Sequence, residues 1–133
     1  MLPKQYRLPL RTEFARVKRV GRVFASRFFG LLVAPQLPEA KNSFPRRARQ
    51  ARIAFIVSKK IHLKANQRNR VRRLMREAVR ALLPKFRPGW DFVFLAKRTI
   101  LGKTLAEIKA ETERILNEKI YCASNKLAYP LAD

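Results

Sequence analysis

Six arginines between residues 68 and 80 form the densest group of side chains able to bind phosphate, and one acidic residue, Glu77, accompanies them. If the segment is helical, four of the six form a stripe at i, i+4 spacing: Arg68, Arg72, Arg76 and Arg80. Like charges at this spacing repel, so the three successive pairs cost roughly 1 kcal/mol in the free protein. The first arginines also lie at the positive end of the helix dipole, which favours anions. This arrangement suits a protein that binds phosphate groups at the start of a helix.

The residue type and the surrounding sequence favour the same interpretation. A planar guanidinium can hold a phosphate through two hydrogen bonds and can stack on a base. Residues 41–76 contain 13 basic residues and no acidic one. The simpler alternative is an ordinary solvated helix face, but such a face usually mixes charges of both signs. Asn69 adds a donor and an acceptor to this surface, although a local cap or turn bond is an equally good interpretation of it.

The whole chain is strongly basic, with 31 Lys and Arg against 9 Asp and Glu and a formal net charge of +22. Such a charge indicates a polyanionic partner, either nucleic acid or an acidic membrane surface. A membrane-surface helix is disfavoured because the apolar side of the arginine-rich helix is needed for the core. A DNA-binding helix-turn-helix is disfavoured because no second helix directly precedes the basic one.

No segment has the pattern of a membrane span or a signal peptide. The longest apolar run, residues 28–34, has seven residues, far fewer than the ~20 that cross a bilayer. Cys122 is the one cysteine, so no disulfide framework is possible. We therefore expect a cytoplasmic protein.

The sequence offers little that could hydrolyse a bond without a partner. Acid–base or metal-assisted hydrolysis needs clustered carboxylates or histidines. His62 is the one histidine and lies in a basic connection, Asp91 opens a predicted strand, and Cys122 has no neighbouring base. We interpret His62 as a surface or RNA-contacting residue and Asp91 as a turn or pairing residue. No catalytic residue and no metal ligand is predicted in the protein itself.

The length predicts a single domain over residues 1–133. Hydrophobic periodicity predicts the α/β class (an α+β sandwich). The predicted elements are a helix over 13–20 between Thr12 and Gly21, one or two strands over 23–35 with a break near Gly30, a strand over 52–58, a helix over 67–83, a strand over 91–97, and a helix opened by a capping box of Thr104 and Glu107. Residues 35–49, rich in proline and basic residues, are predicted to form a flexible insertion loop, and residues 120–133 a loose tail.

Both long helices show an apolar face that should pack on the sheet. In the arginine-rich helix this face consists of Val71, Leu74, Met75, Ala78, Val79 and Leu82. In the last helix it consists of Leu105, Ile108, Thr112, Ile115 and Leu116. Most of the nine phenylalanines should also be core residues, and one or two near the basic helix could stack on unpaired bases.

Three segments together resemble the protein component of bacterial ribonuclease P: "RIAFIVSKK" at 52–60, "ANQRNRVRRLMRE" at 65–77 and "DFVFLAK" at 91–97. The Arg-Asn-Arg core at 68–70, with the basic residues behind it, is the signature segment of that family. The N-terminal "YRLPLRTEFARVKRVGR" at 6–22 is similar to the family's opening. The resemblance covers residues 6 to about 118, with the region 35–49 as an insertion.

The resemblance implies a small central mixed sheet with the order αβββαβα and a left-handed βαβ crossover, where general rules favour a right-handed one. It implies a protein subunit that binds the catalytic RNA of ribonuclease P and the 5′ leader of precursor tRNA, and that assists endonucleolytic removal of the leader to give the mature tRNA 5′ end. The catalytic centre and its Mg²⁺ would then belong to the RNA. No membrane partner and no obligate protein partner is evident.

The residues implied in RNA binding are Arg52, Lys59, Lys60, Arg68, Asn69, Arg70, Arg72, Arg73 and Arg76. The residues implied in leader binding, in a cleft between the N-terminal helix and the sheet, are Phe14 and Lys18. The alternative is a general RNA-binding protein, such as a ribosomal protein or RNA chaperone, with no part in cleavage. Composition alone supports this alternative equally well.

Overall fold

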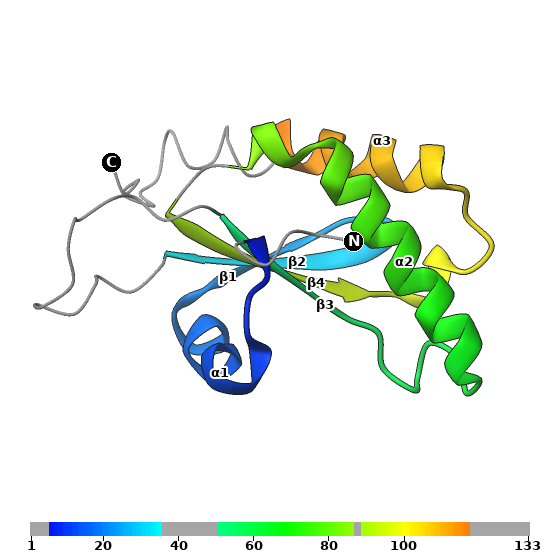
Figure 1. Ribbon diagram of the computed structural model, residues 1–133, viewed down its shortest axis with the longest axis horizontal. Helices are drawn as coiled ribbons and strands as arrows, with labels where there is room; N and C mark the ends of the chain where they lie inside the picture. Colours follow the sequence, from blue (N-terminus) through cyan, green and yellow to red (C-terminus); the bar gives the residue numbers. More distant parts are fainter. Residues whose placement is uncertain (1–5, 36–50, 87–88, 118–133) are drawn as a thin grey trace, which may run out of the picture.

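The computed structural model describes residues 6–35, 51–86 and 89–117 (Figure 1). The elements are α1 (Leu10–Val20), β1 (Arg22–Ala25), β2 (Phe29–Pro35), β3 (Arg52–Ile56), α2 (Ala65–Ala81), β4 (Trp90–Ala96) and α3 (Leu105–Ile115), with single 3₁₀ turns η2 (Leu83–Lys85) and η3 (Arg98–Ile100). This confirms the predicted order αβββαβα. Beyond Pro35, which ends β2, the predicted loop over 35–49 lies outside the described residues, as does the predicted tail over 120–133.

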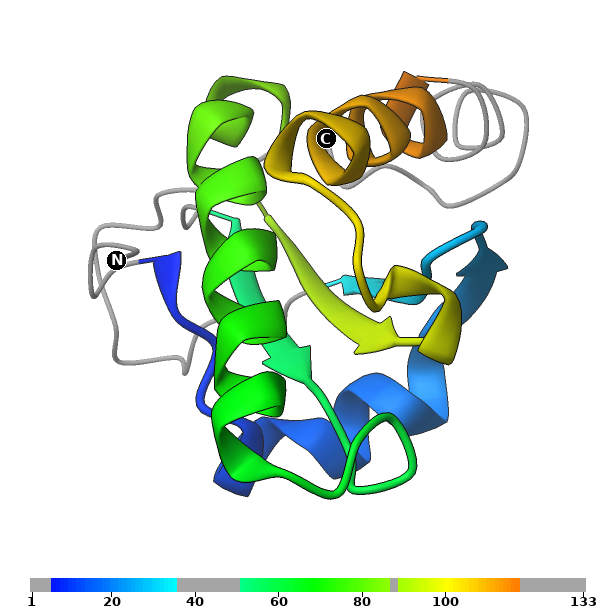
Figure 2. The same ribbon diagram turned by 90° about the vertical axis from the view of Figure 1, so that its right-hand side faces the viewer.

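The four strands form one mixed sheet with the order β1-β2-β4-β3. β1 pairs antiparallel with β2 and β2 with β4, whereas β3 and β4 are parallel and are joined through α2. In Figure 2, α2 lies in front of the sheet, both parallel strands run downward, and β4 lies to the right of β3. This is the left-handed crossover that the resemblance implies, and nearly all other βαβ units have the opposite hand.

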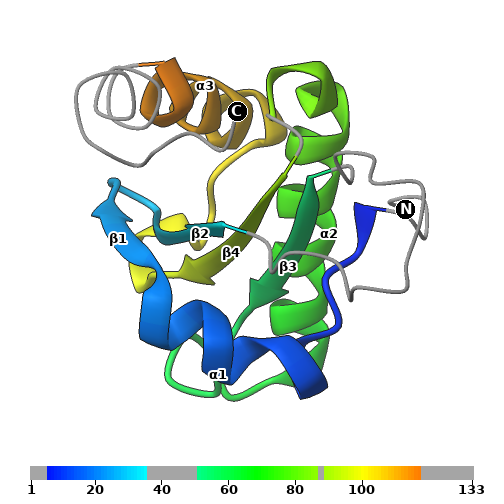
Figure 3. The same ribbon diagram turned by 90° about the vertical axis from the view of Figure 1, so that its left-hand side faces the viewer.

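The sheet buries both of its faces, each against different helices. Figures 1 and 3 show α1 below the sheet and α3 above it. Alternate strand residues point to opposite faces, so Phe92 and Phe94 pack with α2 and α3, whereas Val93 packs with α1. The predicted apolar face of α2 is confirmed, because five of its residues are buried and Leu74 is partly buried against the same core. In the predicted face of α3, Leu105 is the exception, at 40% exposure.

The start of α1 was predicted wrongly. The helix begins at Leu10, with Pro9 as its N-cap, rather than at residue 13. The hydroxyl of Thr12 donates to the Pro9 carbonyl at 3.3 Å instead of accepting from a helix N–H group. Gly21 is the C-cap, as predicted, but with an extended backbone. It has to be glycine because a Cβ atom there would lie 2.4 Å from the Val17 carbonyl oxygen.

The break between β1 and β2 also differs from the prediction. It lies at Ser26–Phe28, and Gly30 is inside β2, paired with Ala25. α3 anchors this turn, because the buried carboxylate of Glu111 accepts from the backbone N–H of Arg27 at 3.0 Å. A hydrogen bond from Arg114 lowers the pKa of Glu111 to about 2, opposed by burial and supported by its contacts with Arg27 and Ser26. The turn is thus fixed by a hydrogen bond to a carboxylate of α3, which a strand pattern does not predict.

The remaining boundaries shift by two residues or fewer at each end. α2 starts at Ala65 rather than residue 67 and ends at Ala81, because Pro84 follows within the 3₁₀ turn η2. The capping box of Thr104 and Glu107 is confirmed at the start of α3. Among the described residues, no helix is both long and apolar enough to cross a membrane.

Candidate RNA interface

The arginines of α2 lie on the side of the helix that its apolar face leaves uncovered. Arg70, Arg73 and Arg80 are exposed, and Arg68, Arg72 and Arg76 are half-buried. Val71, Met75, Ala78 and Val79 of the same helix are buried against the sheet. The amphipathic pattern read from the sequence is therefore present, with the cations outside.

Two of these arginines make hydrogen bonds to neutral groups within the described structure. Arg68 Nη1 donates to the carbonyl oxygens of His62 at 2.9 Å and Leu63 at 2.8 Å. Arg72 Nη1 donates to the amide oxygen of Asn69 at 2.7 Å. A neutral acceptor orients a guanidinium without cancelling its charge, so the positive potential of this face persists.

The start of α2 is the second part of the interface. Its N-cap, Lys64, makes no side-chain capping bond, and the first turn contains no acidic residue. The backbone N–H of Lys64 donates to Nδ1 of His62 at 3.1 Å, so His62 has a local structural role. Lys59 and Lys60 are exposed in the turn that leads to the helix. Uncapped N–H groups, the positive helix dipole and these cations together favour phosphate.

A groove of about 280 Å³ adjoins the arginine face. The N-terminal segment forms one wall by pairing with the edge strand, through Leu8 N–H donating to the Ile53 carbonyl at 3.0 Å. The residues lining the groove are Arg7, Leu8, Leu10, Ile53, Ala54, Phe55, Arg72 and Arg76. The groove therefore joins two arginines of α2 to an apolar floor on β3.

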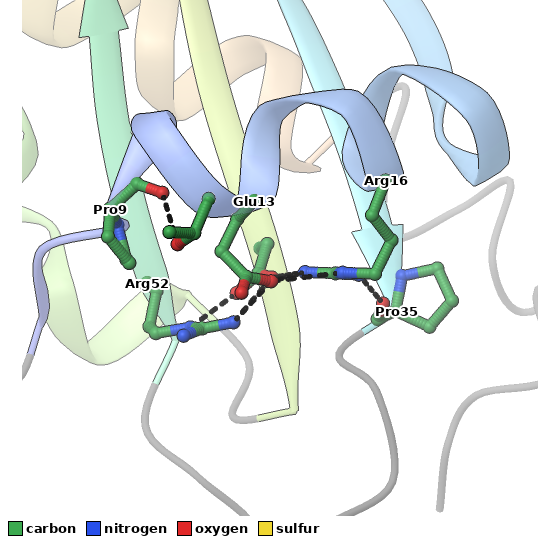
Figure 4. A network of polar contacts seen from close by, with 7 residues as sticks. Pro9, Glu13, Arg16, Pro35 and Arg52 are labelled. Atoms are coloured by element: carbon green, nitrogen blue, oxygen red, sulfur yellow. Dashed lines mark hydrogen bonds and ion pairs between the residues drawn. The ribbon is translucent and has the colours of Figure 1, made fainter.

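Beneath α1 lies a buried network of charges, centred on Asp91 (Figure 4). The carboxylate of Asp91 is fully buried and accepts from Arg16 Nη2 and, at 3.0 Å, from Arg52 Nε. Arg16 also donates to Glu13 Oε1 at 2.9 Å and, through Nη1, to the Pro35 carbonyl at 2.7 Å. The network ties α1 to the ends of three strands at once.

Asp91 and Glu13 determine the protonation state of Arg16. Burial lowers the pKa of Arg16, but the hydrogen bonds and charges of Asp91 and Glu13 outweigh burial and raise it. Arg16 is therefore a permanently charged link between helix and sheet. Asp91 is a pairing residue, as expected from the sequence.

Comparison with known proteins identifies the family. The family model described as Ribonuclease P matches residues 2–119, which is most of the chain. The chain belongs to the ribonuclease P protein family. A ribonuclease P protein component from Roseiflexus castenholzii is 37% identical over 116 residues, covering 86% of each chain. One from Chloroflexus aurantiacus is 32% identical over 133 residues, covering 98% of this chain and 90% of that one.

Solved ribonuclease P proteins share the fold. The protein from Thermotoga maritima superposes with a TM-score of 0.67 at 21% identity, covering 83% of this chain and 94% of that one. The protein from Staphylococcus aureus gives a TM-score of 0.66 at 24% identity, covering 85% and 94%. As a ribonuclease P protein component, the chain is an RNA-binding subunit of an endoribonuclease in tRNA processing, which implies ribonuclease P RNA as its partner. A general RNA-binding protein with no part in cleavage is disfavoured.

The structure brings most of the predicted RNA-binding residues together on one surface and places one of them, Arg52, elsewhere. The turn and α2 bring together Lys59, Lys60, Arg68, Asn69, Arg70, Arg72, Arg73 and Arg76. Arg52 lies apart, 14% exposed and paired with Asp91 and Glu13. Phe14 is half-buried on the α1 side of the sheet, and Lys18 is exposed one helical turn later. Neither of these two residues lines the groove beside α2.

Sequence reasoning missed the wall supplied by Arg7 and Leu8 and the anchoring role of Arg16. An arginine in the middle of the apolar side of α1, one residue before the fully buried Val17, was the available signal for Arg16. The described residues contain no group of three or more His, Cys, Asp or Glu side chains that could hold a metal ion.

Removing the central charge of the network should be costly. Asp91→Asn removes the buried anion of the network and leaves Arg16 and Arg52 with Glu13, which is partly exposed, so we expect the free energy of unfolding in urea to fall by about 3 kcal/mol. Glu113→Gln, which breaks the exposed pair with Lys85, is the control and should change stability little. Equal, small effects of the two substitutions would show that the network does not anchor α1.

Proposed function

We propose that the exposed face and the start of α2 bind the catalytic RNA of ribonuclease P, and that the groove between the N-terminal segment and α2 receives the 5′ leader of precursor tRNA. The observation that carries this proposal is the pairing of Arg68 and Arg72 with neutral acceptors. Their charge, together with that of the exposed arginines beside them, is available to an external polyanion.

The physical task of the protein is electrostatic. Two RNA molecules that must approach each other repel through their phosphates, and a row of guanidinium groups between them lowers that repulsion. Arginine suits this task because its planar fork holds a phosphate in a defined orientation. Bond cleavage and the Mg²⁺ that supports it are assigned to the RNA, and the protein aligns the substrate.

The residues that line the groove support its assignment as the binding site of the 5′ leader. Its apolar floor, which includes Ala54 and Phe55, can take a base, while Arg72 and Arg76 at its edge can take the adjoining phosphates. Phe14 belongs to the apolar cluster that continues from this floor under α1, together with Leu10 and Ile56. An unpaired strand leaving the groove along α1 would reach Phe14 and then Lys18.

Reconstitution tests the proposal as a whole. The protein, the ribonuclease P RNA of the same organism and a precursor tRNA are mixed at physiological Mg²⁺, and cleavage at the mature 5′ end is followed with and without protein. We expect the protein to increase both cleavage and substrate affinity. A variant with Arg72→Gln and Arg76→Gln should give less of this increase while unfolding at the same temperature. If the native protein changes neither quantity, it takes no part in the reaction.

The leader assignment has its own test. Phe14→Leu keeps an apolar side chain but removes the ring, so the reconstituted enzyme should lose affinity for leader-bearing precursor, by about fivefold or more if a base stacks on the ring. Its affinity for mature tRNA should stay the same. Phe24→Leu removes a half-buried ring on the opposite face of the sheet and is the control. Equal losses for the two RNAs would make Phe14 a core residue only.

A further inference from the structure

One end of the sheet carries a second group of cations, away from the groove beside α2. β1 ends and β2 begins at this end, and the parallel strands β3 and β4 finish there. The β1–β2 turn, the turn after β3 and η3 are therefore neighbours, and Figure 2 views the molecule from this end. Besides Lys59 and Lys60, the basic residues here are Arg27, Lys97, Arg98 and Lys103.

Hydrogen bonds from η3 hold these segments in fixed positions. Arg98 Nε donates to the Lys60 carbonyl at 2.8 Å, which joins η3 to the turn before α2. On its other side, the hydroxyl of Thr99 donates to the Arg27 carbonyl, and Lys97 N–H donates to the Phe28 carbonyl at 2.9 Å. The three segments that carry these cations thus adjoin one another, from the turn before α2 across η3 to the β1–β2 turn.

The surface ends in a groove of about 510 Å³ between the β1–β2 turn and the start of α3. Its lining residues are Arg27, Phe28, Thr99, Lys103 and Glu107. The ammonium group of Lys103 lies 5.4 Å from the centre of the half-buried Phe28 ring. A cation–π contact of this kind holds the ammonium at the groove while leaving its charge in place.

Of the two carboxylates nearby, Glu111 is paired with a cation, whereas Glu107 accepts from neutral donors and keeps its charge. Glu107 accepts from the N–H and hydroxyl of Thr104 in the capping box of α3. Glu111 pairs with Arg114 at 2.7 Å. By contrast, Lys97 Nζ donates to the Ser26 carbonyl at 2.8 Å, and Arg98 likewise donates to a carbonyl. The six cations at this end of the sheet outnumber the carboxylate of Glu107, so the surface carries a net positive charge.

We propose that this end of the sheet is a second binding surface for the phosphate backbone of the catalytic RNA, with Arg98 and Lys103 as phosphate-binding residues. The surface continues directly from the start of α2, and its groove lies on the α3 side of the sheet rather than the α1 side. An RNA strand on α2 can extend across η3 to Phe28, whereas a leader under α1 lies on the opposite face. This inference rests on the proposed function, since it deepens the contact with the same RNA.

The test compares two double variants of equal net charge. Arg98→Gln with Lys103→Gln alters the proposed surface, and Arg19→Gln with Lys109→Gln removes two exposed cations elsewhere. Affinity for the organism's ribonuclease P RNA is measured over a series of KCl concentrations, and thermal unfolding is followed in parallel. We expect the first variant to bind about tenfold more weakly, with a salt slope flatter by about 1–2 units for two lost phosphate contacts. The control should lose about threefold or less.

The other possible results show whether the second surface alone or the proposed function as a whole is wrong. Equal losses in both double variants would overturn it, because net charge alone would then explain binding. Unchanged affinity for ribonuclease P RNA, with weaker binding of precursor tRNA by the assembled enzyme, would also overturn it and assign the surface to the substrate. No binding by the native protein would overturn the proposed function too. If the first double variant unfolds, two single variants replace the two double variants: Lys103→Gln as the test and Lys109→Gln as its control. Both keep the hydrogen bond between Arg98 and the Lys60 carbonyl.

Discussion

The structure depends on where a strongly basic chain places its few carboxylates. The sequence has 9 acidic residues against 31 basic ones. Asp91 and Glu13 hold Arg16 and Arg52 under α1, and Glu111 holds the β1–β2 turn against α3. These acids stabilise the scaffold from inside. By contrast, Arg68 and Arg72 of α2 and Lys97 and Arg98 at the end of the sheet donate to carbonyl or amide oxygens, which leave their charges in place.

The topology then gives this surface its shape. Because β3 and β4 are parallel and adjacent, the start of α2 and the turn η3 lie at the same end of the sheet. The N-terminal segment pairs with β3 and adds a groove beside α2. α1 covers the other face and is held there by charge as well as by apolar contacts. The arginine face of α2 and an apolar groove therefore lie side by side on a scaffold that is held together by charge on its other face.

Local patterns predicted most of the fold and the α2 surface, because periodicity and capping are properties of neighbouring residues. The apolar face of α2 and the capping box at Thr104 are examples. Arg52 shows the limit: in the sequence it lies in an acid-free stretch, and its partner Asp91 is 39 residues away. Only the pairing of β3 with β4 brings them together. Likewise, the aromatic residues around Phe28 predict a strand, whereas the structure has a turn at Ser26–Phe28. Glu111, which is distant in the sequence, stabilises that turn.

The most direct measurement is the salt dependence of the native protein's affinity for ribonuclease P RNA. If the surface around α2 neutralises five or more phosphates, the logarithm of the association constant should fall linearly with the logarithm of KCl concentration, with a slope of about −4 or steeper. A slope of about −1 or flatter, with affinity retained at high salt, would contradict the account, because the exposed guanidinium groups would then not be bound to phosphate.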